Sequence, residues 1–381
     1  MHKILIAVAA LAIAPLNASQ AQVKIGITLS ETGPAASLGI VEKNVIDLLP
    51  SKIAGQEVQY TILNDNSDTT TAVQNARKLT NELNVDAIIG STTTPNCLAI
   101  TEVVAETETP LLAMGAGAAI VEPMNEKKKW VFKPVHNDGM MVEAIVAHMA
   151  KAGVKTLGYI GFADATGEGY WAALQPLAQK YGISLVANER YNRTDTTVSG
   201  QILKLIGSSP DAILIAAFGT PAALPQLALR ERNYRGAIYQ THGVANNDFL
   251  RVSGKSAENV ILPLGPLLVA DQLPDNNPSK KVSLDIISRY EGKFGANSRT
   301  TFISNAYDAY LLIANALPVA LAKAKPGTKE FRAALRGAIE ATKNFAGTQG
   351  IYNITPSNHV GIDLNSVVMV TVKDNRWQLL K

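Results

Sequence analysis

The sequence contains a single cysteine, Cys97, among 381 residues. A single cysteine cannot form a disulfide within the chain or a cysteine-based zinc site, so packing has to hold the fold. An excess of charge of one sign is also lacking, because 35 basic residues nearly balance 32 acidic ones and leave a net charge of +3. This balance excludes a strongly basic nucleic-acid binder and an acidic solvating tail.

Catalytic and phosphate-binding motifs are missing as well. No serine lies in a Gly-x-Ser-x-Gly sequence, which excludes the nucleophile elbow of many hydrolases. Gly254-Lys255-Ser256 resembles the end of a phosphate-binding loop, but Phe249 stands where that loop needs a glycine. The five histidines are scattered, and no two are four residues apart as in a helical metal site. We interpret Cys97, in an apolar helix-like stretch, as packed rather than nucleophilic.

Long apolar runs are confined to the N-terminus. Met1-His2-Lys3 gives a positive start, residues 4–16 are almost entirely apolar, and the small residues Ser19 and Ala21 follow. The run is shorter than the roughly 20 residues that span a bilayer. The pattern therefore predicts a signal peptide over residues 1–21, cleaved after Ala21, and an exported, periplasmic protein.

The rest of the sequence alternates short apolar strands with amphipathic helices. Val23–Leu29 is rich in β-branched residues, and a helix with apolar positions three and four apart follows the N-cap residue Asp68. Further strands are predicted at 156–162, 184–191, 212–217 and 237–241. Buried strands between helices indicate parallel sheets covered on both faces, so the predicted fold class is α/β.

The alternation occurs twice, and a tail follows. Too few strands remain after residue 278 for a third domain, so we expect this tail to complete the first two lobes. The tail is predicted to hold helices at 279–294, 304–324 and 328–341 and a strand at 367–373. The predicted boundaries are 22–136 and 268–350 for lobe 1, and 137–267 and 351–381 for lobe 2.

Small, hydroxyl-rich loops follow four of the predicted strands, at 91–94, 115–119, 164–169 and 219–221. Ligands of open parallel sheets bind outside the carboxyl ends of the strands, and hydroxyls at a helix start favour an anion. Capping alone also places serine and threonine there, so any single loop is equally a plain helix cap. Because such loops occur at equivalent places in both predicted lobes, together they indicate a cleft between the lobes that binds a carboxylate.

Several short segments in this order resemble one protein family. They include Val23-Lys24-Ile25-Gly26, Ile88-Ile89-Gly90-Ser91, Gly167-Glu168-Gly169, Gly243-Val244-Ala245-Asn246 and Asn305-Ala306-Tyr307-Asp308. Behind a signal peptide they resemble type I periplasmic solute-binding proteins of the branched-chain amino acid (Leu/Ile/Val-binding) ABC transporter family. The resemblance implies two doubly wound parallel-sheet lobes, joined by three crossovers, that close on a ligand. It implies no catalysis, no cofactor and no metal.

The resemblance also implies which residues contact the ligand. Thr94, with Ser91 close by, matches a hydroxyl that holds the ligand carboxylate in the family. Ala116 and Ala118 match a loop that offers a carbonyl and a hydroxyl to the ligand ammonium, but Ala118 has no hydroxyl. His242 stands where the family has the acidic partner of the ammonium. A buried ammonium needs acceptors, whereas histidine can donate to a carboxylate or keto oxygen.

The predicted walls of the cleft favour a bulkier ligand. Leu38, Thr166 and Thr220 replace aromatic residues of the family, and the sequence resembles the subset that takes aromatic acids and their keto acids. The alternative for His242 is a structural role without ligand contact. Three arginines that could clamp a carboxylate are interpreted as solvated instead, namely Arg77, Arg193 and Arg230.

The resemblance implies a small carboxylate ligand and, as partner, an inner-membrane ABC permease with ATPase subunits. It implies a monomer, and no nucleic acid is expected. Three alternatives stay open from the sequence: a branched-chain or other amino acid-binding protein of the same transporter class, a ligand-sensing subunit, and a secreted enzyme using the same cleft.

Overall fold

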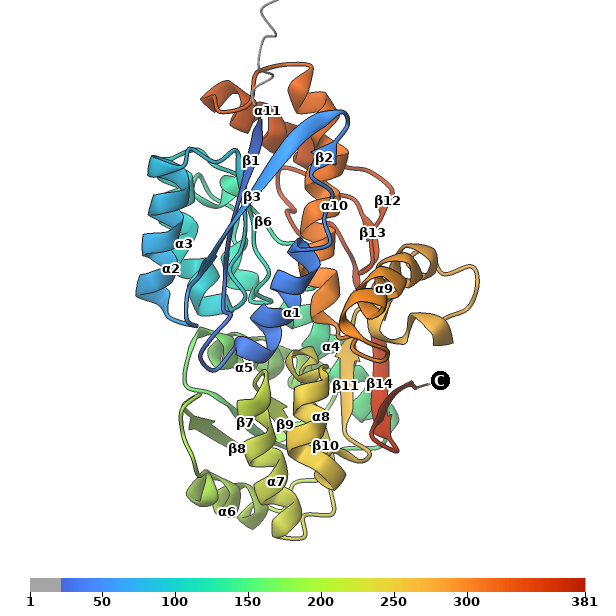
Figure 1. The fold of residues 1–381 in the computed structure, drawn as a ribbon. Coiled ribbons are helices and arrows are strands. Elements are labelled where there is room, and N and C mark those ends of the chain that lie inside the picture. The colour runs from blue at the N-terminus through green and yellow to red at the C-terminus, as the bar shows by residue number, and fades with distance from the viewer. Residues whose placement is uncertain (1–21, 381) are drawn as a thin grey trace, which may run out of the picture.

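The structure is a computed structural model that describes residues 22–380. It contains two α/β lobes, one above the other in Figure 1, between which the chain crosses repeatedly. The predicted signal peptide and its cleavage site after Ala21 lie outside the described residues. Across residues 22–380, none of the helices combines the length and apolar character needed to cross a membrane.

The first lobe is built on a six-stranded sheet with the order β2-β3-β1-β4-β5-β6. Its neighbouring strands are parallel except for the short β2–β3 pair. The strands are β1 (Val23–Leu29), β2 (Lys52–Ile53), β3 (Gln56–Asn64), β4 (Ala87–Gly90), β5 (Leu111–Leu112) and β6 (Val131–Phe132). Helices α2 (Thr69–Arg77) and α3 (Thr94–Glu106) pack together on one face, and α1 (Ala36–Ile46) packs with α10 (Phe302–Leu321) on the other (Figure 1).

The second lobe is built on a seven-stranded sheet with the order β15-β14-β11-β10-β9-β7-β8. Strands β7 to β11 are parallel, and β14 and β15 extend one edge in antiparallel fashion. These strands are β7 (Thr156–Phe162), β8 (Ser184–Tyr191), β9 (Ala212–Ala216), β10 (Ala237–Gln240), β11 (Ile261–Leu264), β14 (Val368–Lys373) and β15 (Arg376–Leu379). The helices of this lobe are α4 (Asp138–Lys151), α5 (Ala165–Lys180), α6 (Ser199–Gly207), α7 (Ala223–Glu231) and α8 (Asn247–Ser253).

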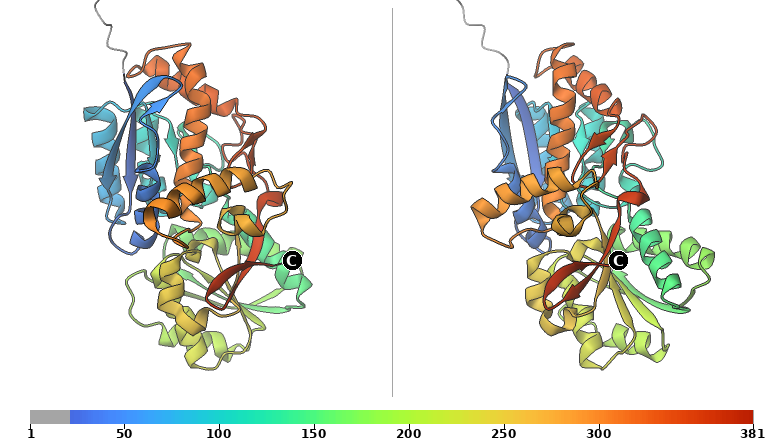
Figure 2. Two further views of the ribbon diagram at one scale, coloured as in Figure 1. Left: turned by 45° about the vertical axis from the view of Figure 1, so that its right-hand side comes forward. Right: turned by 90° about the vertical axis from the view of Figure 1, so that its right-hand side faces the viewer.

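Three passages of the chain connect the two lobes within residues 22–380 (Figure 2). The first joins β6 to α4, and the second runs from β11 through η7 (Pro266–Gln272) and α9 (Lys280–Phe294) to α10. After α10 come α11 (Lys329–Glu340) and the small pair β12 (Phe345–Ala346) and β13 (Ile351–Tyr352), from which the third passage leads to β14. This arrangement confirms the predicted fold of two parallel-sheet lobes joined by three crossovers.

A buried carboxylate in α10 fixes the segment that enters the third passage. Asp308 is fully buried and accepts hydrogen bonds from Thr348 N (2.8 Å), Thr348 Oγ1 (2.8 Å), Gln349 N (2.9 Å) and the Tyr352 hydroxyl (2.7 Å). All four donors come from residues 348–352, so one side chain orders that stretch against the first lobe.

Asp308→Asn should lower the free energy of unfolding by about 2 kcal/mol, because the amide NH2 group cannot accept the hydrogen bonds that the carboxylate oxygen accepts at the same place. Urea denaturation of both proteins measures this loss. Asp275→Asn, at a fully exposed aspartate whose surface ion pair with Lys280 is worth little, is the matched control and should leave the free energy of unfolding nearly unchanged. Equal stability of Asp308→Asn and wild type would show that these four bonds do not hold the crossover.

Candidate functional site

A cleft lies between the lobes, where the loops after β4, β5, β7, β9 and β10 face each other. About 380 Å³ of it is free of protein atoms, including the part open to solvent. The lining residues are Leu38, Thr92, Thr93, Thr94, Met114, Gly115, Ala116, Thr166, Tyr170, Ala217, Phe218, Thr241, His242, Gly243, Phe302 and Asn305. The cleft therefore occupies the carboxyl ends of both sheets, where open α/β folds bind ligands.

Three consecutive threonines form the first lobe's wall, and their hydroxyls have different surroundings. Thr92 Oγ1 donates to Glu42 Oε2 at 2.5 Å and accepts from Ser30 N at 3.1 Å. Thr94 Oγ1 accepts from Gly117 N at 3.1 Å. The Thr93 hydroxyl is buried, makes no capping bond to α3 and has no partner, so helix capping does not explain it.

The second lobe presents another unpartnered hydroxyl. Thr166, at the start of α5, lines the cleft, and its buried Oγ1 has no hydrogen-bond partner. Asp164 caps this helix instead, because its side chain accepts from the backbone N–H groups of Thr166 and Gly167. Each lobe thus contributes one threonine hydroxyl that the protein itself leaves unsatisfied, and buried hydroxyls normally find a partner.

His242 is a neutral hydrogen-bonding group in this cleft. Its Nδ1 lies 3.2 Å from the Tyr170 hydroxyl. Burial, together with the charge of Lys133, lowers the pKa of His242 to about 4, while burial raises the pKa of Tyr170 well above its ordinary value. Tyr170 therefore keeps its proton, and donating it to Nδ1 leaves the imidazole proton on Nε2 as a donor.

The cleft offers little to a positive charge. None of the residues that line it within the described chain is an aspartate or glutamate. The Ala116 carbonyl accepts from Lys133 Nζ and from Asp138 N, each at 3.1 Å, so both its lone pairs are occupied. Lys133 is itself fully buried, and burial lowers its pKa to about 7.

Five of the eight predicted site residues line this cleft, namely Leu38, Thr94, Ala116, Thr166 and His242. Three lie outside its lining. Ser91 Oγ donates to Asp65 Oδ2 at 2.5 Å, Ala118 N donates to Asp138 Oδ1 at 3.1 Å, and Thr220 lies in the short η4 turn (Thr220–Ala222).

The structure also shows lining residues that the sequence did not single out. The aromatic side chains are Tyr170, Phe218 and Phe302, so the cleft has aromatic walls beside the smaller Leu38 and Thr166. A hydroxyl-rich run pointed to the loop of Thr93, whereas nothing local marked these three aromatic residues as neighbours.

Three other sequence interpretations have definite outcomes. Cys97 is fully buried, its Sγ lies 3.1 Å from Ser91 O, and burial raises its pKa to about 12, so the packed interpretation is confirmed. The interpretation of Arg193 as solvated is wrong. Its side chain is 14% exposed, and its Nε lies 2.6 Å from Oδ2 of Asp164, the N-cap residue of α5. Arg77 is exposed as expected.

Comparison with known sequences matches residues 22–376 to the family described as "Periplasmic binding protein". The chain belongs to this periplasmic binding protein family. No curated protein matches the chain. Among solved structures, an extracellular ligand-binding receptor from Rhodopseudomonas palustris HaA2 is 46% identical, with a TM-score of 0.92 over 95% of this chain and 100% of its own.

More distant structures share the fold of this periplasmic binding protein. The leucine-binding protein LivK from Thermotoga maritima MSB8 is 22% identical, with a TM-score of 0.82 over 94% of this chain and 98% of its own. A solute-binding protein from R. palustris in complex with benzoate is 17% identical, with a TM-score of 0.82 over 94% and 95% of the two chains.

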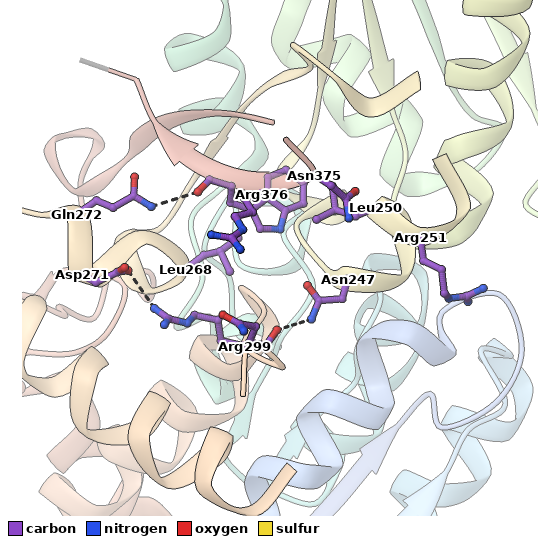
Figure 3. Close-up of a pocket in the computed structure, with 11 residues that line it drawn as sticks. Asn247, Leu250, Arg251, Leu268, Asp271, Gln272, Arg299, Asn375 and Arg376 are labelled. Carbon is purple, nitrogen blue, oxygen red and sulfur yellow. Dashed lines mark hydrogen bonds and ion pairs between the residues drawn. The ribbon is translucent and has the colours of Figure 1, made fainter. Parts of the chain in front are cut away.

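A wider groove of this periplasmic binding protein lies beside the second crossover, between α8, η7 and the turn before β15 (Figure 3). Most of its polar side chains are already engaged. Arg299 pairs with Asp271 (3.0 Å) and Glu291 (2.8 Å), and Gln272 Nε2 donates to Trp377 O at 3.1 Å. Arg251 points away from the groove (Figure 3) and pairs with Asp248. The interlobe cleft, with its unsatisfied hydroxyls, is therefore the stronger candidate.

Proposed function

We propose that this periplasmic binding protein captures a small carboxylate, an aromatic acid or a 2-oxo acid, and delivers it to an inner-membrane ABC permease with ATPase subunits. The observation that carries the proposal is the pair of buried, unpartnered hydroxyls of Thr93 and Thr166, one on each lobe. A ligand with acceptor oxygens supplies the missing partners. It also holds the two lobes together, which is the mechanical task of a capturing protein.

The polar groups of the cleft favour an acid without an ammonium group. The Ala116 carbonyl is occupied by Lys133 and Asp138, and no acidic side chain lines the cleft within residues 22–380. The neutral His242 can donate to a keto or carboxylate oxygen. An ammonium would find only neutral acceptors there, such as the hydroxyl oxygens of Thr93 and Thr166, and no carboxylate to offset its charge, so it would lose hydration at a cost of several kcal/mol.

The aromatic side chains favour a ligand with a ring. Tyr170 and Phe218 come from the second lobe and Phe302 from α10, so a planar group bound in the cleft would meet aromatic side chains from both lobes. The benzoate complex of a solute-binding protein with this fold supports the idea that such a cleft can hold an aromatic carboxylate.

A ligand screen by thermal shift and calorimetry tests the proposal with aromatic acids, 2-oxo acids and amino acids. A ligand at 100 times its dissociation constant should stabilise the protein by about 2.7 kcal/mol. The ligand should be recovered unchanged after long incubation with stoichiometric protein. Failure of every carboxylate to bind, or recovery of a chemically altered ligand, would overturn the proposal.

Thr93→Val should weaken binding of the preferred acid by about 2 kcal/mol, because the change removes a hydroxyl that donates to a charged group and keeps the side-chain volume. Calorimetric titration measures the change. Thr101→Val, at the half-buried Thr101 of α3 away from the cleft, is the matched control. A dissociation constant unchanged in Thr93→Val, with an intact circular dichroism spectrum, would place the anion elsewhere.

A further inference from the structure

A second, open pocket between the lobes lies on the side of strand β8, at the sheet edge opposite β14 and β15. From the first lobe it is lined by Asp68, Pro95 and Asn96, and from the second by Asp164 and Arg193. Thr94 and Thr166 of the main cleft are close neighbours of these residues in sequence. Phe218 connects the two spaces, because it lines the main cleft and lies under the Arg193 guanidinium, 4.7 Å from ring centroid to Cζ.

Two side chains at this end, Asn96 and Arg193, have buried polar atoms without partners, as Thr93 and Thr166 do. Asn96 is fully buried, and neither its Oδ1 nor its Nδ2 has a hydrogen-bond partner. Arg193 uses Nε to contact Asp164 at 2.6 Å, but its buried Nη2 has no partner. A buried amide and a buried guanidinium nitrogen without partners, one from each lobe, need an explanation in a folded protein.

The charges around the Asn96 amide and Arg193 Nη2 determine which ligand group could serve as their hydrogen-bond partner. Arg193 is already paired with Asp164, and the exposed carboxylate of Asp68, which caps α2, lines the same pocket. A second carboxylate on the ligand would therefore meet more negative than positive charge. A hydroxyl suits the pair better, because it can accept from Arg193 Nη2 and donate to Asn96 Oδ1.

We infer that Asn96 and Arg193 form a subsite that selects ligands with a hydroxyl group at the end away from the acid. This inference rests on the proposed function, because it assumes an acid held in the main cleft. The ring of such a ligand would pack near Phe218, and its hydroxyl would reach the subsite. The preferred class is then a ring-hydroxylated aromatic acid or 2-oxo acid.

Calorimetry with matched ligand pairs tests the subsite. Wild-type protein should bind 4-hydroxyphenylpyruvate about 10-fold or more tightly than phenylpyruvate, as one hydrogen bond to a charged donor allows. Asn96→Leu, which is close in volume, should abolish this advantage and leave the affinity for phenylpyruvate within about twofold. Arg193→Lys should reduce the advantage while it keeps the charge beside Asp164, and it serves as the second variant if Asn96→Leu does not fold.

The outcomes separate the subsite from the proposed function. Equal affinity for both members of the pair, or an advantage that survives in both variants, overturns the subsite and leaves carboxylate capture standing. Tighter binding of terephthalate than of 4-hydroxybenzoate shows an anion site and also overturns the hydroxyl assignment. If no member of either pair binds, both the subsite and the proposed function for aromatic acids fail.

Discussion

Wild-type protein should bind phenylpyruvate at least about 100-fold more tightly than phenylalanine, a difference of about 2.7 kcal/mol or more. The two molecules differ in one group, a keto oxygen against an ammonium. The keto oxygen can accept from the neutral His242, whereas the ammonium meets an Ala116 carbonyl that Lys133 and Asp138 already occupy. A buried charge with neither a carboxylate nor a full set of acceptors around it costs several kcal/mol.

Two variants at His242 connect this preference to the imidazole. His242→Glu should weaken phenylpyruvate, because two carboxylates then repel, and should narrow the gap to phenylalanine. His242→Gln, which keeps a donor without adding charge, is the matched control and should retain the preference. Calorimetric titration of the three proteins measures all six affinities. Tighter binding of phenylalanine or leucine than of any oxo or aromatic acid by the wild type contradicts this account of the cleft.

The sequence was most informative where short strands alternate with amphipathic helices. The predicted strands 156–162 and 184–191 coincide with β7 and β8, although β7 is buried and β8 is a partly exposed edge strand, because the helical patterns on either side of them limit where a strand can lie. Helix α1 was not predicted, since its N-cap residue Ala35 makes no capping bond and the helix contains Gly39 and a buried Glu42. Strand β3 was also missed, although its alternation of polar and apolar residues is a strand signal.

The site was less predictable because it depends on packing between distant segments. The run of threonines in the sequence located the loop after β4. It did not show that the hydroxyls of Thr92 and Thr94 are hydrogen-bonded within the protein while that of Thr93 has no partner. Arg193 lies in a loop that appears solvated in sequence, and only the fold brings it to Asp164 and Phe218. Long-range contacts of this kind leave no local pattern.

Glu42→Gln should stabilise the protein relative to wild type by an amount that grows by about 3 to 4 kcal/mol between pH 5 and pH 8. Glu42 is fully buried in α1, and burial raises its pKa from 4.5 to about 8, although Thr92 donates to it. Between these two values the unfolded chain releases the proton and the folded chain keeps it, so wild-type stability falls as the pH rises. Glutamine resembles the protonated form and does not titrate.

Urea denaturation of both proteins across this pH range measures the difference in stability, with Glu57→Gln, at an exposed glutamate of β3, as the control.

The affinity for the ligand should follow the same titration of Glu42, because Thr92 lines the cleft and its hydroxyl donates to Glu42 at 2.5 Å. As the pH rises past 8, the ionised Glu42 places a negative charge behind the wall proposed to hold the ligand carboxylate, so wild-type affinity should fall more steeply than that of Glu42→Gln, in which only Lys133 loses its charge. Parallel pH profiles of stability and affinity in the two proteins would show that Glu42 does not carry the proton at neutral pH.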